Sequence, residues 1–295
     1  MSRKIRGKGN TMDIDQVSED GPISESGGPT PEMQTFVSKV PEVTLVFWII
    51  KIVCTTLGEI GADALTMSYF GETTADVDPF WKTYGYLVGA AIFFGVFIIS
   101  VGVQISAKHF HPFIYWTTIV ATTLLGTALA DYFTRSGGAG YFWGSVILFA
   151  CVAASLVLWK AVTGTIDIAS VRTARSEIFY WVTIMFSQTL GTALGDYVAS
   201  DDGLGLGYLA SAAIFGGAML VLVLIYYFTS SSRTILFWIA FILTRPLGAV
   251  VGDFLDKPHE DGGLELSRHA ATAILLVLII AAILVFPQKP AEESH

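Results

Sequence analysis

The chain has 295 residues, of which 53% are hydrophobic and only 14% are charged, and its mean hydropathy is +0.61. Soluble domains usually carry about 25% charged residues, so the composition excludes an ordinary soluble protein and indicates an integral membrane protein. The formal net charge of -8 argues against a nucleic-acid partner.

The first segment, residues 1–40, is rich in Ser, Gly, Glu, Asp and Pro and has almost no aromatic residues. Such a segment cannot bury enough apolar surface to fold alone, so we expect a disordered cytoplasmic tail. Its basic cluster, Arg3 to Lys8, is not followed by the apolar segment of a signal peptide. We expect a membrane domain over residues 41–287 and a short C-terminal tail over 288–295.

Eight apolar segments in the membrane domain are long enough for a helix to cross a bilayer, which takes about 20 residues. They are residues 43–65, 84–107, 113–133, 140–160, 178–199, 206–229, 234–255 and 268–286. The segments are longer than barrel strands and do not alternate strictly between apolar and polar residues. The sequence therefore predicts an all-α, polytopic membrane protein with eight transmembrane helices.

Lysine and arginine are distributed unequally between the two sides of these helices. Eleven lie on the side of the N-terminal tail and four on the other side, and two more lie within helices. By the positive-inside rule both termini are cytoplasmic. The opposite loops carry nine acidic residues, which would make that face attractive to cations.

The odd-numbered helices repeat one unit, W-x9-G-x4-D, four times without gaps. The units are Trp48/Gly58/Asp63, Trp116/Gly126/Asp131, Trp181/Gly191/Asp196 and Trp238/Gly248/Asp253. The repeats span residues 43–107, 113–160, 178–229 and 234–286. A tryptophan at this end of a helix is typical of the aromatic belt at a membrane interface. The glycine, followed four residues later by another small residue, predicts close helix packing.

A polar stripe runs along each odd-numbered helix at positions 3, 7, 11 and 15 after the tryptophan. These positions share one helix face, and charged side chains in membrane helices normally face the bundle interior or water. We therefore expect the odd helices at the centre, the even helices in a lipid-facing ring and the four aspartates converging near one axis. The stripe's polar residues are Lys51, Thr55, Glu59 and Asp63, then Thr123, Thr127 and Asp131, then Gln188, Thr192 and Asp196, then Arg245 and Asp253.

The carboxylates of the stripe are candidate metal ligands, because hard cations prefer oxygen donors. The candidate set is Glu59, Asp63, Asp131, Asp196 and Asp253, with Lys51, Thr55, Thr123, Thr127, Gln188, Thr192 and Arg245 as supporting polar or charge-pairing residues. Glu59 and Asp63 stack one turn apart and form the strongest candidate for a metal or proton site. The alternative is an ion pair from Glu59 to Lys51 or Arg245.

The four units resemble those of a bacterial family of uncharacterised multi-pass membrane-anchored proteins. That family is defined by four tandem repeats, each with two transmembrane segments and a tryptophan. The resemblance covers residues 42 to 286 and is clearest at 122–132 and 189–197. It implies the topology and a bacterial cell (inner) membrane, and it brings no established function.

The leading functional hypothesis is a cation transporter, with a divalent metal such as Mn²⁺ as cargo and protons as the coupling ion. One alternative is a non-catalytic membrane scaffold or sensor with internally paired charges. The other is an intramembrane acid–base enzyme, but Ala193 breaks the Gly-x-Gly-Asp form of intramembrane aspartyl proteases. We expect no enzymatic activity and no cofactor. The expected partners are the lipid bilayer and the cation; the sequence sets no oligomeric state.

Overall fold

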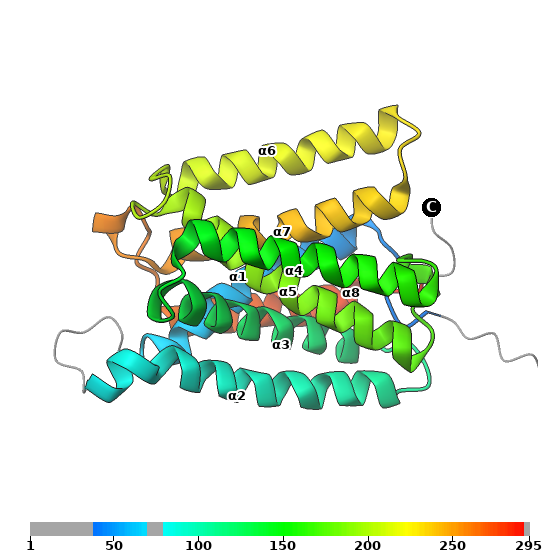
Figure 1. Cartoon of the computed structure of the whole chain (residues 1–295), viewed down its shortest axis with the longest axis horizontal. Coiled ribbons are helices and arrows are strands. Elements are labelled where there is room, and N and C mark those ends of the chain that lie inside the picture. The colour runs from blue at the N-terminus through cyan, green and yellow to red at the C-terminus, as the bar shows by residue number, and fades with distance from the viewer. Residues whose placement is uncertain (1–37, 70–78, 292–295) are drawn as a thin grey trace, which may run out of the picture. The chain divides into compact units, whose positions relative to one another are not determined.

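The computed structural model describes residues 38–69 and 79–291. The expected tail over residues 1–40 thus lies almost wholly outside the described residues. Eight long helices form the described part of the chain (Figure 1). They are α1 (Leu45–Thr66), α2 (Pro79–Ser106), α3 (Pro112–Asp131), α4 (Gly140–Thr163), α5 (Ala174–Ala199), α6 (Gly207–Phe228), α7 (Arg233–Asp256) and α8 (Arg268–Val285). The predicted eight-helix, all-α fold is confirmed.

Seven of the helices in the described ranges are long and apolar enough to cross a membrane by length and composition alone. The helix outside this set is α5, which has 26 residues but contains polar side chains such as Glu177, Gln188 and Asp196. It packs between α3, α4 and α7, so its polar residues are enclosed by other helices rather than by lipid. Such enclosure lets a polar helix lie at membrane depth.

The four odd-numbered helices form a closed inner ring. Helix α1 packs against α3 and α7, and α5 packs against the same two helices on the opposite side. This arrangement confirms that the odd helices are central. It also defines an axis, enclosed by α1, α3, α5 and α7, on which the polar stripes can meet.

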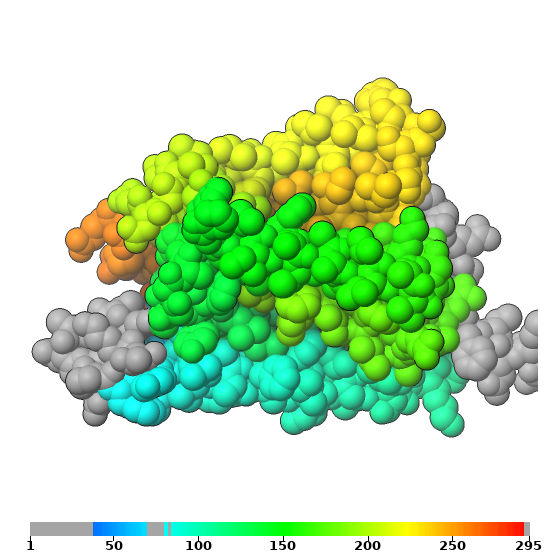
Figure 2. Space-filling view, in the orientation of Figure 1, coloured from blue at the N-terminus to red at the C-terminus, as the bar shows by residue number. Residues whose placement is uncertain are grey.

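The even-numbered helices form an outer ring, and each one covers the inner helix of the next repeat. Helix α2 packs on α3, α4 on α5, α6 on α7, and α8 returns to pack on α1. Between 61% and 67% of the most apolar stretch of α1, α3 and α7 is buried, against 11% to 28% in the outer helices. In the face seen in Figure 2, α2, α4 and α6 form most of the surface.

The motif glycines explain how the inner helices approach one another. Each glycine lies against the residue at position 7 of the next repeat, so that Gly58 faces Thr123, and Gly248 closes the ring against Thr55. At Gly126 an added Cβ would lie 2.7 Å from the Cβ of Gln188 and 2.9 Å from its carbonyl carbon. Only a residue without a side chain fits this contact, which is the packing expected of a small-xxx-small face.

Candidate functional site

The four polar stripes meet on the axis of the inner ring, in four levels. The sixteen side chains at positions 3, 7, 11 and 15 of the four repeats are all buried, each at most 4% exposed. Two equivalent hydrogen bonds join neighbouring repeats: Thr123 donates to the carbonyl of Cys54, and Thr55 donates to the carbonyl of Thr244, both over 3.3 Å. Twelve of the sixteen are polar or charged, and the apolar ones are Ile119, Ile184, Phe241 and Ala249, so the axis is a mainly polar column that becomes apolar towards the tryptophans.

An ion pair occupies the middle of this column. The guanidinium of Arg245 donates to the carboxylate of Glu59 over 2.9 Å and also to the hydroxyls of Thr127 and Thr192. Both hydroxyls lie 3.3 Å from the same Glu59 oxygen. All four inner helices thus contribute one side chain to the cluster, which holds a buried charge pair with several hydrogen bonds, as such a pair requires.

Towards the tryptophan end, the column contains polar groups with few partners. The ammonium of Lys51 donates to the hydroxyl of Thr244 over 3.2 Å and lies 3.8 Å from the centre of the Phe241 ring. The amide of Gln188 and two nitrogens of Arg245 have no hydrogen-bond partner among the described residues. Buried polar groups without partners are uncommon, so this level is less well satisfied than the ion pair below it.

At the other end of the column, two bases bridge the four motif aspartates in pairs. Arg135 lies 3.2 Å from Asp131 and 3.4 Å from Asp196. It belongs to a π-helical turn, Tyr132–Ser136, that ends α3. Lys257 lies 3.2 Å from Asp253 and also contacts Asp63. In both bridges the base is four residues after the aspartate of its own repeat and reaches the aspartate of the next repeat.

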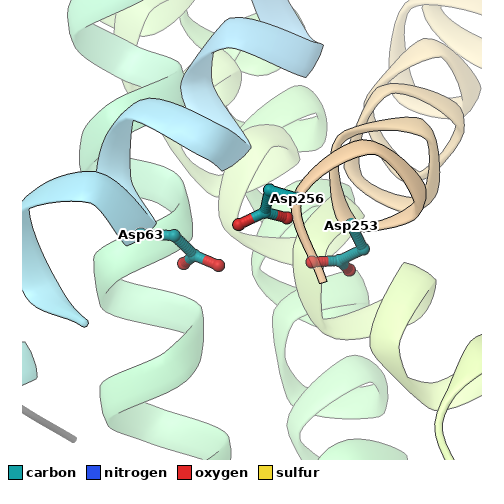
Figure 3. A group of neighbouring side chains, drawn as sticks. All are labelled: Asp63, Asp253 and Asp256. Atoms are coloured by element: carbon teal, nitrogen blue, oxygen red, sulfur yellow. The ribbon is translucent and has the colours of Figure 1, made fainter. Parts of the chain in front are cut away.

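A fifth carboxylate joins one of these pairs. Asp256 is buried beside Asp253, and its Oδ2 accepts from Arg268 over 2.6 Å. Ligand oxygens of Asp63, Asp253 and Asp256 all lie within 4.8 Å of one another. Figure 3 shows the three carboxylates, one from α1 and two from α7, turned towards a shared space. Within the described ranges, this trio is the group of His, Cys, Asp or Glu residues placed to hold a metal ion.

A cavity of about 700 Å³ opens next to the aspartates, with Arg135, Asp256, Lys257 and Arg268 in its lining. Five buried carboxylates here face three bases, a formal balance of two negative charges when all eight groups are ionised. Burial alone would lower the pKa of Lys257, but the carboxylates of Asp63, Asp253 and Asp256 outweigh that effect and raise this pKa well above its usual value.

The tryptophan end is closed by aromatic rings. The side chains of Trp116, Trp181 and Trp238 are buried, so the prediction of an aromatic belt facing the membrane interface is wrong for these three repeats. The rings pack edge-on or tilted against Tyr115 and Tyr180, which lie between them. Phe47, Phe237 and Phe241 join them in the same buried cluster, and aromatic pairs favour such geometries.

Chain segments outside the helices cover this aromatic layer. Residues 40–42 pair with residues 289–291 through backbone hydrogen bonds. The indole of Trp116 donates to Gln288 over 2.6 Å, and that of Trp238 donates to the carbonyl of Ile166. The column is thus closed at its tryptophan end and reaches a cavity at its aspartate end.

The structure places the candidate residues in three groups along the column. Glu59, Thr127, Thr192 and Arg245 meet at mid-column, and the alternative reading, a Glu59–Arg245 ion pair, is the arrangement seen. Asp63 lies with Asp253, while Asp131 and Asp196 share Arg135. Glu59 and Asp63 thus pair with different bases, Arg245 and Lys257. Lys51, Thr55, Thr123 and Gln188 line the column nearer the tryptophans.

Three residues of this end, Asp256, Arg135 and Lys257, are absent from the candidate set drawn from the sequence. A signal for all three exists, because residues three or four positions after a helical aspartate lie on the same face one turn on. Asp256 follows Asp253 by three residues, and each base follows its aspartate by four. The helical backbone continues beyond Asp131 and Asp253, and this extension places the three residues beside the motif aspartates.

Comparison with known proteins gives one family. No curated protein and no solved structure matches the chain. The family described as a Repeat of Unknown Function (DUF347) matches it four times in tandem, at residues 46–110, 114–165, 179–232 and 236–287. Each match holds one inner helix and the outer helix that follows it. The chain therefore belongs to the DUF347 repeat family, as a membrane protein made of four such repeats.

Proposed function

We propose that the protein transports cations across the membrane along the axis of the inner ring, with a divalent metal ion as cargo. One observation carries the proposal: buried polar side chains at positions 7, 11 and 15, with Lys51 at position 3, run inside the ring and end in an acidic cluster beside a cavity. Ionisable side chains inside a membrane domain are costly and usually mark an ion or proton pathway. A column with hydroxyl, amide and carboxylate groups offers the oxygen donors that hard cations prefer.

The excess of two negative charges at the aspartate end favours a divalent over a monovalent cargo. A divalent cation would neutralise the cluster, whereas burial of uncompensated charge costs several kcal/mol. Protons are the natural coupling ion, because crowded carboxylates cannot all stay ionised when the metal leaves. In this proposal the Glu59–Arg245 pair closes the column at its middle and must open for a cation to pass.

The distribution of lysine and arginine gives the proposed orientation. The side of the tryptophans carries most of the basic residues and would face the cytoplasm of a bacterial cell. The aspartate cluster and its cavity would then face outward. Both ends of the chain would be cytoplasmic, next to the segments that cover the aromatic layer.

The test is metal flux into liposomes that contain the purified protein. Glu59→Gln strands Arg245 without its partner, which should cost about 3–5 kcal/mol of stability. The double variant Glu59→Gln/Arg245→Gln removes both charges and should recover most of that stability. We expect wild-type protein to carry Mn²⁺ and the stable double variant to lose at least about tenfold of the flux, because the column then lacks its mid-membrane carboxylate.

The matched control is Glu177→Gln. Glu177 is also a buried carboxylate in an ion pair, 2.7 Å from Lys39, but it lies outside the polar stripe. Its loss should leave flux per folded protein unchanged. A stable double variant with wild-type flux of several divalent cations would contradict a path through Glu59.

A second function, a scaffold or sensor that moves no ion, is favoured by one specific observation. Glu59 and the four motif aspartates all lie within ion-pair distance of a base. If the charges serve only to hold the ring together, the wild-type protein carries no flux of any cation tested. In that case Glu59→Gln lowers only the stability of the protein, and Glu59→Gln/Arg245→Gln restores this stability.

A further inference from the structure

The four repeats are not equivalent at the aspartate end, and the difference separates two junctions. The junction between repeats two and three holds Asp131 and Asp196 with Arg135. The junction between repeats four and one holds Asp253 and Asp63 with Lys257. Position 18 is Thr134 in repeat two and Asp256 in repeat four, so the second junction alone gains a third carboxylate.

We propose that the junction between repeats four and one is a binding site for one hard divalent cation, with Asp63, Asp253 and Asp256 as ligands and the Lys257 ammonium as a tethered occupant that the metal displaces. The other junction, in the same proposal, is a structural bridge. The role of the site in transport rests on the proposed function, but binding itself does not.

Buried oxygens without partners point to a missing ligand at this junction. One carboxylate oxygen of Asp63 and one of Asp256 are buried and accept no hydrogen bond from any described residue; at the other junction both oxygens of Asp131 also lack one, although one of them lies 3.2 Å from Arg135. The side chains are 1% and 0% exposed, and both are turned into the shared space (Figure 3). A carboxylate oxygen left unpaired in a buried site is costly, and a metal ion would satisfy both.

The identity of the two bases supports the assignment of roles. Arginine is planar and presents several donors at once, so Arg135 can hold Asp131 and Asp196 in a fixed geometry. Lysine is a point charge on a flexible stem, so Lys257 can withdraw towards the cavity that it lines. Lys257 thus holds the carboxylates together when the metal is absent and makes room when it arrives.

The cavity gives a cation access to this junction. Asp256 and Lys257 both line it, together with Met67, Ser68 and Arg268. Carboxyl oxygens within 4.8 Å of one another can coordinate one ion at the usual oxygen–metal distances of about 2.0–2.6 Å. The chemistry selects a cation of the Mn²⁺, Mg²⁺ or Ca²⁺ class rather than a soft metal, since the ligands are all oxygens.

The test measures Mn²⁺ binding to the purified full chain in detergent by the loss of the free-ion paramagnetic resonance signal. We expect one site per chain. Asp63→Asn and the charge-neutral double variant Asp256→Asn/Arg268→Gln should each weaken binding at least about tenfold, because each removes a ligand. Lys257→Gln should tighten binding about tenfold or more, because it removes the competing charge at close range.

The pseudo-symmetric junction provides the matched control. Asp131→Asn should change Mn²⁺ affinity by less than about threefold, the effect of a more distant charge. Protein stability is followed with EDTA and with Mn²⁺, so that a folded variant with lost binding shows an unchanged midpoint in EDTA and no upward shift with the metal. Equal weakening by Asp131→Asn and Asp63→Asn, or no tightening by Lys257→Gln, overturns the proposal.

Binding and flux separate the two proposals from each other. Binding with the expected pattern in a protein that carries no flux keeps the metal site and rejects transport. Mn²⁺ flux that survives both Asp63→Asn and Asp256→Asn/Arg268→Gln keeps transport and rejects this site. Failure of wild-type protein to bind Mn²⁺ at millimolar concentration rejects the site directly.

Discussion

The inner and outer helices of this protein have opposite chemistry although they alternate along the chain. Inner helices carry charged, hydroxyl and amide groups on one face and glycine or alanine beside it, while outer helices are almost uniformly apolar. In water an apolar core drives folding, but lipid is as apolar as leucine and gives no such drive. The inner ring is therefore held by close packing and buried polar contacts, and the outer ring separates those contacts from lipid.

The largest expected loss of stability comes from removing one charge of an ion pair in the inner ring. Arg245→Leu leaves the Glu59 carboxylate buried without its base, so we expect a loss of about 3–5 kcal/mol in the free energy of unfolding. The measurement is reversible unfolding in bicelles or mixed micelles. Arg233→Leu, in the first turn of the same helix, is the control and should cost less than about 1 kcal/mol. Equal losses would mean that the buried pair contributes no more than a surface contact.

A smaller effect separates glycines in the two rings. Gly126→Ala pushes a Cβ against the backbone of Gln188 and Thr189, which should cost about 1–3 kcal/mol. Gly102→Ala in α2 meets no atom within 4 Å, so the better helix propensity of alanine should stabilise that helix by up to about 1 kcal/mol. The same substitution is thus expected to have opposite signs, measured as shifts of the unfolding midpoint. Equal shifts would show that inner helices have room to move apart.

The smallest effect is expected on the lipid-facing surface. Ile99 in α2 is 69% exposed, and Ile99→Ala should change stability by less than about 0.5 kcal/mol, because lipid fills the space of the lost atoms. Leu158→Ala in α4 is a second surface probe, with 57% exposure. A loss as large as that for Gly126→Ala would show that a partner subunit, rather than lipid, covers this surface.

Much of the fold can be predicted from the sequence, because the positions of the helices and the inward face of each inner helix are both encoded by local patterns. Apolar runs of about 20 residues mark the helices, and the tryptophan, glycine and aspartate at fixed spacing mark the face of each inner helix. The same periodicity placed Glu59 and Arg245 on the axis correctly. It could not give the packing of α8 on α1 or of α2 on α3, since one sequence contains no record of which outer helix covers which inner one.

The partners of the charged groups were harder to predict because pairing depends on neighbours in space. Glu59 could pair with Lys51, Arg245 or a metal, and only the ring order brings Arg245 next to it. Arg135 and Lys257 lie one turn beyond the apolar runs, where helix and loop cannot be told apart by hydropathy. In each helix taken alone, the position of the tryptophan is equally compatible with a ring at the membrane interface and with a ring packed inside. The inward orientation of Trp116, Trp181 and Trp238 depends on the closed ring of helices.

The cover of α1 by α8 constrains the order in which the protein can be assembled during synthesis. Helix α1 is made before the other seven and brings Lys51, Glu59 and Asp63 into the membrane. The bases that pair with the two carboxylates, Arg245 and Lys257, are made much later, in α7 and directly after it. Helix α8, which covers α1, is made last. Roughly two hundred residues must be made before these charges have partners, and each unpaired charge costs about 2.5–3.5 kcal/mol at the centre of a membrane. Helix α1 therefore has to stay beside water or the insertion machinery until α7 is made, and the outer ring closes only when α8 follows.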